Sequence, residues 1–135
     1  LRNYQRTLED YSDYVEIARN AGAGETLDRI IPEIYNEAMF PGTAMLYSFP
    51  SYVYSLWQEY SVEELEYIAS FCKEKEIPAA TVYWEYWSEE TEKIFEKNGI
   101  SLYVYTVNDR DQARRYISQG AEGICTDFLT AEDLW

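Results

Sequence analysis

The side chains that could do chemistry in this sequence are carboxylates, hydroxyls and aromatic rings, because its 135 residues include no histidine. Without an imidazole the chain offers no Ser–His or Cys–His pair for nucleophilic catalysis. Its two cysteines, Cys72 and Cys125, lack the spacing of a metal or redox motif. The glycines form no phosphate-binding loop, and spacing singles out no pair among the 25 acidic residues as a glycosidase pair. We therefore predict no catalytic residue and no metal site within the chain itself.

Helix and strand patterns alternate along the chain. An amphipathic helix comes first, and later helices begin at capping residues such as Ser88 and Ser61, the latter with Glu64 three residues on. Gly and Pro separate these helices from short runs rich in branched and aromatic residues, which are typical of strands. This alternation predicts an α/β fold of parallel βα units in a single unit over residues 1–135. In the first part of the chain we predict a helix over 4–18, a strand over 29–35, a helix or turn over 36–39 broken at Pro41–Gly42, and a strand over 44–49. The aromatic stretch over 50–60 is left unassigned. After it we predict a helix capped by Ser61, a strand over 79–84, a helix from Ser88 to Asn98, a strand over 100–107, a helix capped by Asn108, a strand over 123–126 and a final turn capped by Thr130.

Two segments near the C-terminus carry a motif. They read Tyr105-Thr-Val-Asn-Asp109 and, after a helix, Gly120-Ala-Glu-Gly-Ile-Cys-Thr-Asp127. This pattern resembles the C-terminal signature of glycerophosphodiester phosphodiesterases, usually Trp-Thr-Val-Asn, a helix and Gly-Val-Asp-Gly-Ile-x-Thr-Asp. Upstream, Arg29-Ile-Ile-Pro-Glu-Ile-Tyr-Asn-Glu37 is similar to an Ile-Pro-Gln-Ile-Tyr-Asn strand end of some members, so the resemblance covers nearly the whole chain. The sequence departs from the pattern where Tyr105 replaces Trp, Glu122 replaces Asp and Glu33 replaces Gln.

The resemblance implies a TIM (β/α)8 barrel of which this chain holds the C-terminal five strands, so the barrel is incomplete in this chain. The missing upstream strands would carry the family's His-Arg-Gly motif, a Glu-x-Asp metal pair, a second His and a further metal-binding Glu. The parent would hydrolyse a glycerophosphodiester to an alcohol and glycerol phosphate, using two histidines and a divalent cation, Ca²⁺ or Mg²⁺. This chain would hold no cofactor of its own and would be inactive alone.

Such barrels build the substrate pocket at the C-terminal ends of their strands. We expect these ends near 33–36, 47–49, 83–85, 105–108 and 126–127. Plainer alternatives stay open: Glu33 as a solvent-facing acid, Tyr105 as a core aromatic and Asn108 as a helix cap. The pocket candidates are Glu33, Tyr35, Tyr47, Trp84, Glu85 and Tyr105, and the structural motif residues are Thr106, Asn108, Gly123, Thr126 and Asp127.

Charge and hydropathy limit the partners. With 11 basic and 25 acidic residues the net charge is −14, which repels a nucleic-acid backbone, so no nucleic-acid partner is expected. The chain shows no signal peptide and no apolar run of membrane-spanning length, and its compartment stays open. We expect a small phosphodiester or lipid headgroup to be bound through the parent. The alternatives are a non-catalytic α/β module that binds a sugar or lipid headgroup, and a half-barrel whose open strand edges form a homo-oligomer or pair with the missing N-terminal half.

Overall fold

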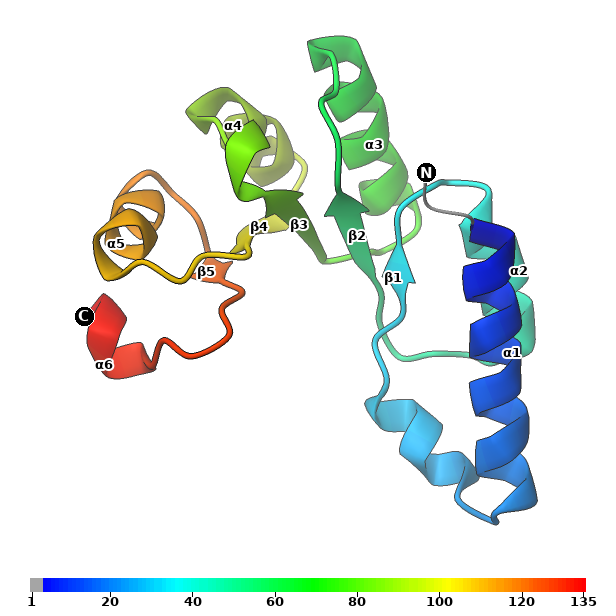
Figure 1. Ribbon diagram of the computed structural model, residues 1–135. Coiled ribbons are helices and arrows are strands. Elements are labelled where there is room, and N and C mark those ends of the chain that lie inside the picture. Colours follow the sequence, from blue (N-terminus) through cyan, green and yellow to red (C-terminus); the bar gives the residue numbers. More distant parts are fainter. Residues whose placement is uncertain (1–3) are drawn as a thin grey trace. The chain divides into compact units, whose positions relative to one another are not determined.

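The computed structural model describes residues 4–135 (Figure 1), which form two compact units, one ending at Val53 and one running from Tyr54 to Trp135. The first unit holds α1 (Tyr4–Asn20), the 3₁₀ helix η1 (Gly24–Arg29), β1 (Glu33–Ile34) and α2 (Met39–Leu46), and β2 (Val53–Leu56) begins at its end. The second holds α3 (Val62–Glu74), β3 (Ala79–Tyr83), η2 (Trp84–Tyr86), α4 (Glu89–Lys97), β4 (Ser101–Tyr105), α5 (Arg110–Ser118), β5 (Gly123–Ile124) and α6 (Ala131–Leu134). None of these helices in residues 4–135 has the length and apolar character needed to cross a membrane.

The strands form one sheet in the order β1-β2-β3-β4-β5, with parallel pairing of β3 with β4 and of β4 with β5. Sequence order equals spatial order, as expected when each strand is followed by a helix that returns the chain to start the next parallel strand. The predicted α/β fold of parallel βα units is therefore confirmed. The single unit over residues 1–135 stays a prediction.

Local capping signals explain where the helices of the second unit begin. The Ser61 hydroxyl accepts the Glu64 backbone N–H at 3.2 Å, and the Glu64 carboxylate accepts the Ser61 N–H at 2.7 Å, which completes a capping box at α3. At α4 the Ser88 hydroxyl accepts the Thr91 N–H at 3.0 Å. Both predicted caps are confirmed, and α3 lies against α4 (Figure 1).

Burial alternates along β3 and β4. Val82 and Val104 are buried on the face that the helices cover, whereas Thr81 and Tyr103 are half-buried on the opposite face. In β2 the same division places Tyr54 against Phe71 of α3, with ring centroids 6.4 Å apart. We call the face that turns away from the helices the inner face.

Two predictions in the first unit are wrong. The strand expected over 44–49 does not form, because α2 continues to Leu46 and residues 47–49 are neither helix nor strand. Pro41–Gly42 lie inside that helix instead of breaking it. Pro41 is the third helical residue, where its missing N–H has no intrahelical partner to lose. Gly42 faces α1: a Cβ there would lie 3.1 Å from Leu8 Cδ1, so glycine allows the two helices to approach closely. The strand of this region, β2, instead lies in the stretch over 50–60 that the sequence left unassigned.

Candidate functional site

Aromatic rings meet at the C-terminal ends of β3 and β4 on the inner face. The parallel register places Tyr83 beside Tyr105, each the last residue of its strand. Their ring centroids are 5.7 Å apart with planes inclined by 57°. The strand ends predicted over 83–85 and 105–108 therefore lie next to each other, at the edge where α/β folds place their ligands.

Tyr83 joins further rings to this pair. Directly after it, η2 turns the chain so that Trp84 and Tyr86 lie 5.7 Å and 5.8 Å from the Tyr83 ring, centroid to centroid. Trp84 and Tyr86 are both exposed, at 39% and 36%. We call Tyr83, Trp84, Tyr86 and Tyr105 the aromatic cluster, and it offers an apolar surface that a ligand can reach.

A hydroxyl pair lies beside the aromatic cluster. The Ser55 hydroxyl of β2 is directed at the Tyr105 hydroxyl oxygen at 3.5 Å, longer than the usual hydroxyl–hydroxyl bond of about 2.7–2.8 Å. Ser55 is buried, at 1% exposure, and Tyr105 is half-buried. The inner face therefore holds polar groups among its aromatic rings.

The geometry unites part of the predicted pocket. Trp84 and Tyr105 meet through Tyr83, and Glu85 lies exposed on the same 3₁₀ turn. Tyr83 and Ser55 were not among the predicted candidates. Tyr83 could have been found because it shares strand periodicity and a strand end with its neighbours, whereas Ser55 lies where the pattern was unclear. This arrangement can stack on an apolar or sugar group and donate hydrogen bonds, but it contains no acid–base pair.

Glu33 and Tyr35 are hydrogen-bonded to side chains of α1 in the first unit. The Tyr11 hydroxyl accepts the Glu33 backbone N–H and donates to the Glu33 carbonyl, both at 3.0 Å. Tyr35 is buried, and its hydroxyl lies 2.7 Å from the Thr7 hydroxyl. These two predicted pocket residues are therefore bonded to the first helix.

The expectation that Tyr47 ends a strand is wrong. Tyr47 follows the last residue of α2, and its hydroxyl donates to the Asp28 carboxylate. That hydrogen bond, with a smaller contribution from desolvation, raises the pKa of Tyr47 above its usual value. The helix that replaced the expected strand accounts for the different place of this side chain.

Asn108 ties two loops together instead of capping α5. Its side-chain amide donates to the Asp127 carboxylate at 2.8 Å, and its Oδ1 accepts the Thr126 hydroxyl at 2.9 Å and the Asp127 N–H at 3.0 Å. The cap of α5 is Asp109, whose carboxylate accepts the Gln112 N–H at 2.8 Å. The predicted cap at Asn108 is wrong because the neighbouring aspartate takes that role. The motif thus joins the loop after β4 to the loop after β5.

Gly123 and Thr106 complete the predicted motif residues. A Cβ at Gly123 would lie 2.7 Å from Tyr103 Cε1, so only glycine leaves room for this ring on the inner face. Gly123 is paired with Tyr103 in the parallel register. Thr106 is exposed at the end of β4.

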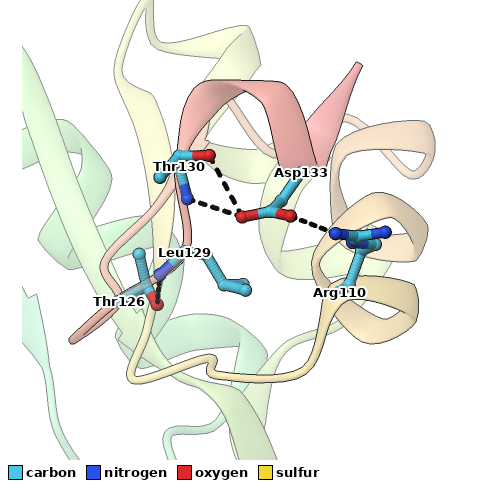
Figure 2. A network of polar contacts seen from close by, with 5 residues as sticks. All are labelled: Arg110, Thr126, Leu129, Thr130 and Asp133. Carbon is cyan, nitrogen blue, oxygen red and sulfur yellow. Dashed lines mark hydrogen bonds and ion pairs between the residues drawn. The ribbon is translucent and has the colours of Figure 1, made fainter.

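A second polar network fixes the final helix (Figure 2). The Asp133 carboxylate accepts the Thr130 N–H at 2.9 Å and the Thr130 hydroxyl at 3.1 Å, and it pairs with the Arg110 guanidinium of α5. Foremost the Thr130 backbone bond, and then Arg110, hold the pKa of Asp133 below its usual value. Thr126 accepts the Leu129 N–H at 3.2 Å in the preceding turn. The predicted cap at Thr130 is therefore confirmed.

A divalent cation does not fit the side chains described. Within residues 4–135 no three Asp, Glu or Cys side chains converge as metal ligands, and the sequence supplies no histidine.

A family comparison accounts for the strands and the motif together. The sequence profile of the glycerophosphoryl diester phosphodiesterase family matches residues 34–131, more than half of the chain. The chain belongs to this family. The matched range holds β2 to β5 and both halves of the Asn108–Asp127 connection.

Solved structures related to this phosphodiesterase-family chain share its fold at low sequence identity. A protein of Silicibacter pomeroyi assigned as a glycerophosphoryl diester phosphodiesterase matches with a TM-score of 0.66 and 15% identity over 94% of this chain and 43% of its own. A glycerophosphodiester phosphodiesterase from Parabacteroides distasonis gives 0.63 and 16%, over 94% of this chain and 50% of its own. An Oleispira antarctica phosphodiesterase, in complex with the product sn-glycerol-3-phosphate, gives 0.56 and 12%, over 76% and 37%. No curated protein sequence matches the chain.

The coverage has a direct structural meaning. The chain spans half or less of the length of these phosphodiesterase structures, although they cover most of the chain. Its parallel βα units therefore correspond to part of a TIM barrel.

Proposed function

We propose that this chain is the C-terminal part of a glycerophosphodiester phosphodiesterase-like hydrolase whose parent cleaves a glycerophosphodiester to an alcohol and glycerol phosphate. The observation that carries the proposal is the aromatic cluster at the C-terminal ends of β3 and β4, the edge where a barrel of this fold builds its pocket. In the parent, Tyr83 and Tyr105 form one wall of that pocket. Their rings exclude water from the alcohol part of the substrate, and the Tyr105 hydroxyl donates a hydrogen bond to it.

The chain alone is expected to be inactive. Hydrolysis of a phosphodiester needs a positioned acid and base and neutralisation of the phosphate charge. The sequence has no histidine, and the carboxylates of residues 4–135 do not converge on a common ligand position. We propose that the parent's remaining strands supply the proton-transfer groups and hold a Ca²⁺ or Mg²⁺ ion.

The first experiment compares the 135-residue chain with a longer chain that adds whatever coding sequence lies upstream in the gene. Each is incubated with sn-glycero-3-phosphoethanolamine and Ca²⁺ or Mg²⁺, and released glycerol phosphate is measured. We expect product only from the extended chain. Hydrolysis by the 135-residue chain would contradict its inactivity, and an extended chain that is folded but inactive with both ions would contradict the parent's activity.

A pair of variants tests the pocket wall in the active, extended chain. Tyr105→Ala should lower kcat/KM about tenfold, because truncation removes an aromatic contact and a hydroxyl from the substrate. Tyr67→Ala is the control, since Tyr67 is an exposed tyrosine of α3 outside the aromatic cluster. Equal kcat/KM values for the two variants would remove Tyr105 from the pocket.

A second candidate function is a non-catalytic module that binds a sugar or lipid headgroup. The exposure of Trp84 favours it, because a large exposed ring next to Tyr83 is available for stacking without any metal. Binding of glycerol phosphate or a sugar to the 135-residue chain in the presence of a chelator would support it. The signal must disappear in Trp84→Ala and persist in Trp135→Ala, a control at another exposed tryptophan.

We also propose that the chain associates through the free edge of β5, either with a second copy or with the N-terminal half of the barrel. β5 is the last strand in the sheet order, and an unpaired edge is a template for another strand. Light scattering coupled to size-exclusion chromatography should give a mass that rises with concentration. A constant monomer mass across a hundredfold concentration range would contradict self-association.

A further inference from the structure

The outer edge of β1, which is the edge that faces away from β2, is bonded by a side chain instead of a strand. The Pro32 carbonyl accepts the Val53 N–H at 3.1 Å, so this carbonyl faces the β2 side. Backbone groups of successive residues in a strand point to alternate edges, so the N–H and C=O of Glu33 face outward. Because β1 is the first strand in the sheet order, no strand of residues 4–135 pairs with this edge.

A single hydroxyl meets both of these outward groups. The Tyr11 hydroxyl of α1 accepts the Glu33 N–H and donates to the Glu33 carbonyl, at 3.0 Å in each case. These are the donor and the acceptor that a neighbouring strand would use. A hydroxyl suits the position because it donates and accepts at once, which a phenylalanine ring cannot do. Tyr11 therefore occupies a strand-pairing position of the edge.

The spacing of residues lets α1 follow β1. Four residues rise about 6 Å along a helix, and two residues rise about 6.6 Å along a strand. Thr7 precedes Tyr11 by four residues, and its hydroxyl lies 2.7 Å from the hydroxyl of Tyr35, two residues after Glu33. One face of the helix thus contacts residues 35 and 33 in turn and runs in the direction opposite to the strand.

The edge becomes accessible at Ile31, two residues before Glu33. Val15 comes four residues after Tyr11 on α1, and together with Ile31 it lines a cavity of about 410 Å³. The side chain of Ile31 is 60% exposed. The helix therefore leaves room beside the chain at this point, and the Tyr11 contact is the boundary between the covered and the accessible part of the edge.

We propose that α1 closes the outer edge of β1 against the addition of a strand, and that Tyr11 is the residue that keeps it closed. The partner that this contact excludes is the same edge of a second copy, which would need the N–H and C=O of Glu33 for pairing. Such a strand can pair only after α1 has detached, so helix docking and strand addition exclude each other. The inference is independent of the hydrolase proposal and of the association proposed through β5, which lies at the other end of the strand order.

The first test is native-state hydrogen exchange of the full 135-residue chain, followed by NMR. Tyr11→Phe removes only the hydroxyl, and the Glu33 amide should then exchange at least about tenfold faster. The control is Thr7→Val, which removes the other hydroxyl contact of α1 but leaves the Glu33 N–H with its acceptor. Its Glu33 exchange should stay within about threefold of the unmodified chain. Equal acceleration in both variants would show only a loosened helix and would overturn the role of Tyr11.

The unmodified chain gives a readout that needs no variant. If the edge opens only when α1 detaches, the Glu33 amide exchanges through the same opening as amides within the helix, such as that of Val15. The free energies of exchange of both amides should then fall with the same slope in urea. Exchange of Glu33 through a separate opening, smaller or larger than that of Val15, would overturn the inference. This measurement decides the question even if Tyr11→Phe fails to fold.

Strand addition itself is measured by light scattering. The net charge of −14 makes copies repel each other, so the experiment is run in about 0.5 M NaCl, which screens this repulsion. At equal concentration Tyr11→Phe should form larger assemblies than the unmodified chain, and Thr7→Val should not. Association through β5 would affect all three chains alike, so it cannot produce this difference. A folded Tyr11→Phe variant with the mass of the unmodified chain would overturn the exclusion of a partner strand.

Discussion

The helices of the two compact units begin in different ways. In the second unit α3, α4 and α5 begin at side-chain caps, Ser61, Ser88 and Asp109. In the first unit the residue before α2 is Ala38, which has helical dihedral angles and no side-chain cap bond. Helix α2 depends instead on packing against α1, where Gly42 meets Leu8. Helices with local start signals can be located from sequence, whereas a helix specified by its neighbour cannot.

The largest effect is expected from truncating a large, fully buried side chain in each unit. Phe95→Ala in α4 and Leu27→Ala in η1 truncate side chains that are 0% and 1% exposed. We expect losses of about 3–5 kcal/mol for Phe95→Ala and about 2–5 kcal/mol for Leu27→Ala in the free energy of unfolding, measured in urea. Hydrogen exchange then shows where protection is lost. If each variant lost protection equally in both units, the division at Val53 would have no energetic meaning.

Two glycines differ in the space that is available for a side chain. Gly123→Ala places a Cβ 2.7 Å from the Tyr103 ring, and we expect a loss of about 1–3 kcal/mol in the free energy of unfolding. Gly24→Ala is the control, because a Cβ there meets nothing within 4 Å. Thermal unfolding of both variants measures the difference. An unaffected Gly123→Ala would mean that Tyr103 moves aside without cost.

The capping contrast itself can be tested at two positions. Ser61→Ala should lower the free energy of unfolding by about 1 kcal/mol, because the Glu64 N–H loses its partner. Ala38→Ser should add little, since the helical dihedral angles at Ala38 do not present a side chain to the first-turn N–H groups. Urea unfolding measures both. A clear gain in stability from Ala38→Ser would mean that α2 accepts a local start signal after all.

The same contrast explains how much of the fold the sequence could predict. Capping residues, strand runs and terminal glycines located α3 to α5 and β3 to β5, since these signals act within a few residues. The segment over 44–49 reads as a strand because its residues are mostly apolar, whereas its first half, to Leu46, belongs to the helix that packs against α1. β2 was missed because Tyr54, Ser55 and Leu56 are all buried, so no polar alternation marks the strand.

The candidate site follows the same division. Tyr105, Trp84 and Glu85 were predicted from strand ends and from the resemblance, and all belong to the second unit. Tyr47 was misplaced with its helix. Tyr83 links the predicted residues. Its place at a strand end can be found from the sequence, whereas its contact with Tyr105 comes from the register of β3 against β4. Pairing partners between strands are tertiary information.

The smallest effects are expected for two exposed hydrogen bonds to carboxylates, those of Asp133 and Asp28, which should break at opposite ends of the pH range. In the second unit the pKa of Asp133 is lowered from 3.8 by the Thr130 backbone bond and Arg110. A lowered native pKa stabilises the fold above the unfolded value, and this contribution is lost as pH falls through the native pKa. We therefore expect α6 to loosen below about pH 4, seen as a change in the Thr130 amide NMR signal. Asp133→Asn should show no such transition.

In the first unit a pKa is raised instead of lowered, so stability depends on pH in the opposite direction. The hydrogen bond to Asp28 raises the pKa of Tyr47 from 10.0, so its contribution is complete below pH 10 and is lost as pH rises through the native value. Ultraviolet titration of Tyr47, by difference from Tyr47→Phe, should give a pKa above 10.0, and Asp28→Asn should lower it, because the neighbouring charge is removed. A Tyr47 pKa unchanged by Asp28→Asn would mean that the hydroxyl does not bind this carboxylate. Because both contacts are exposed, each pH change should alter local order and leave the global unfolding of its unit nearly the same.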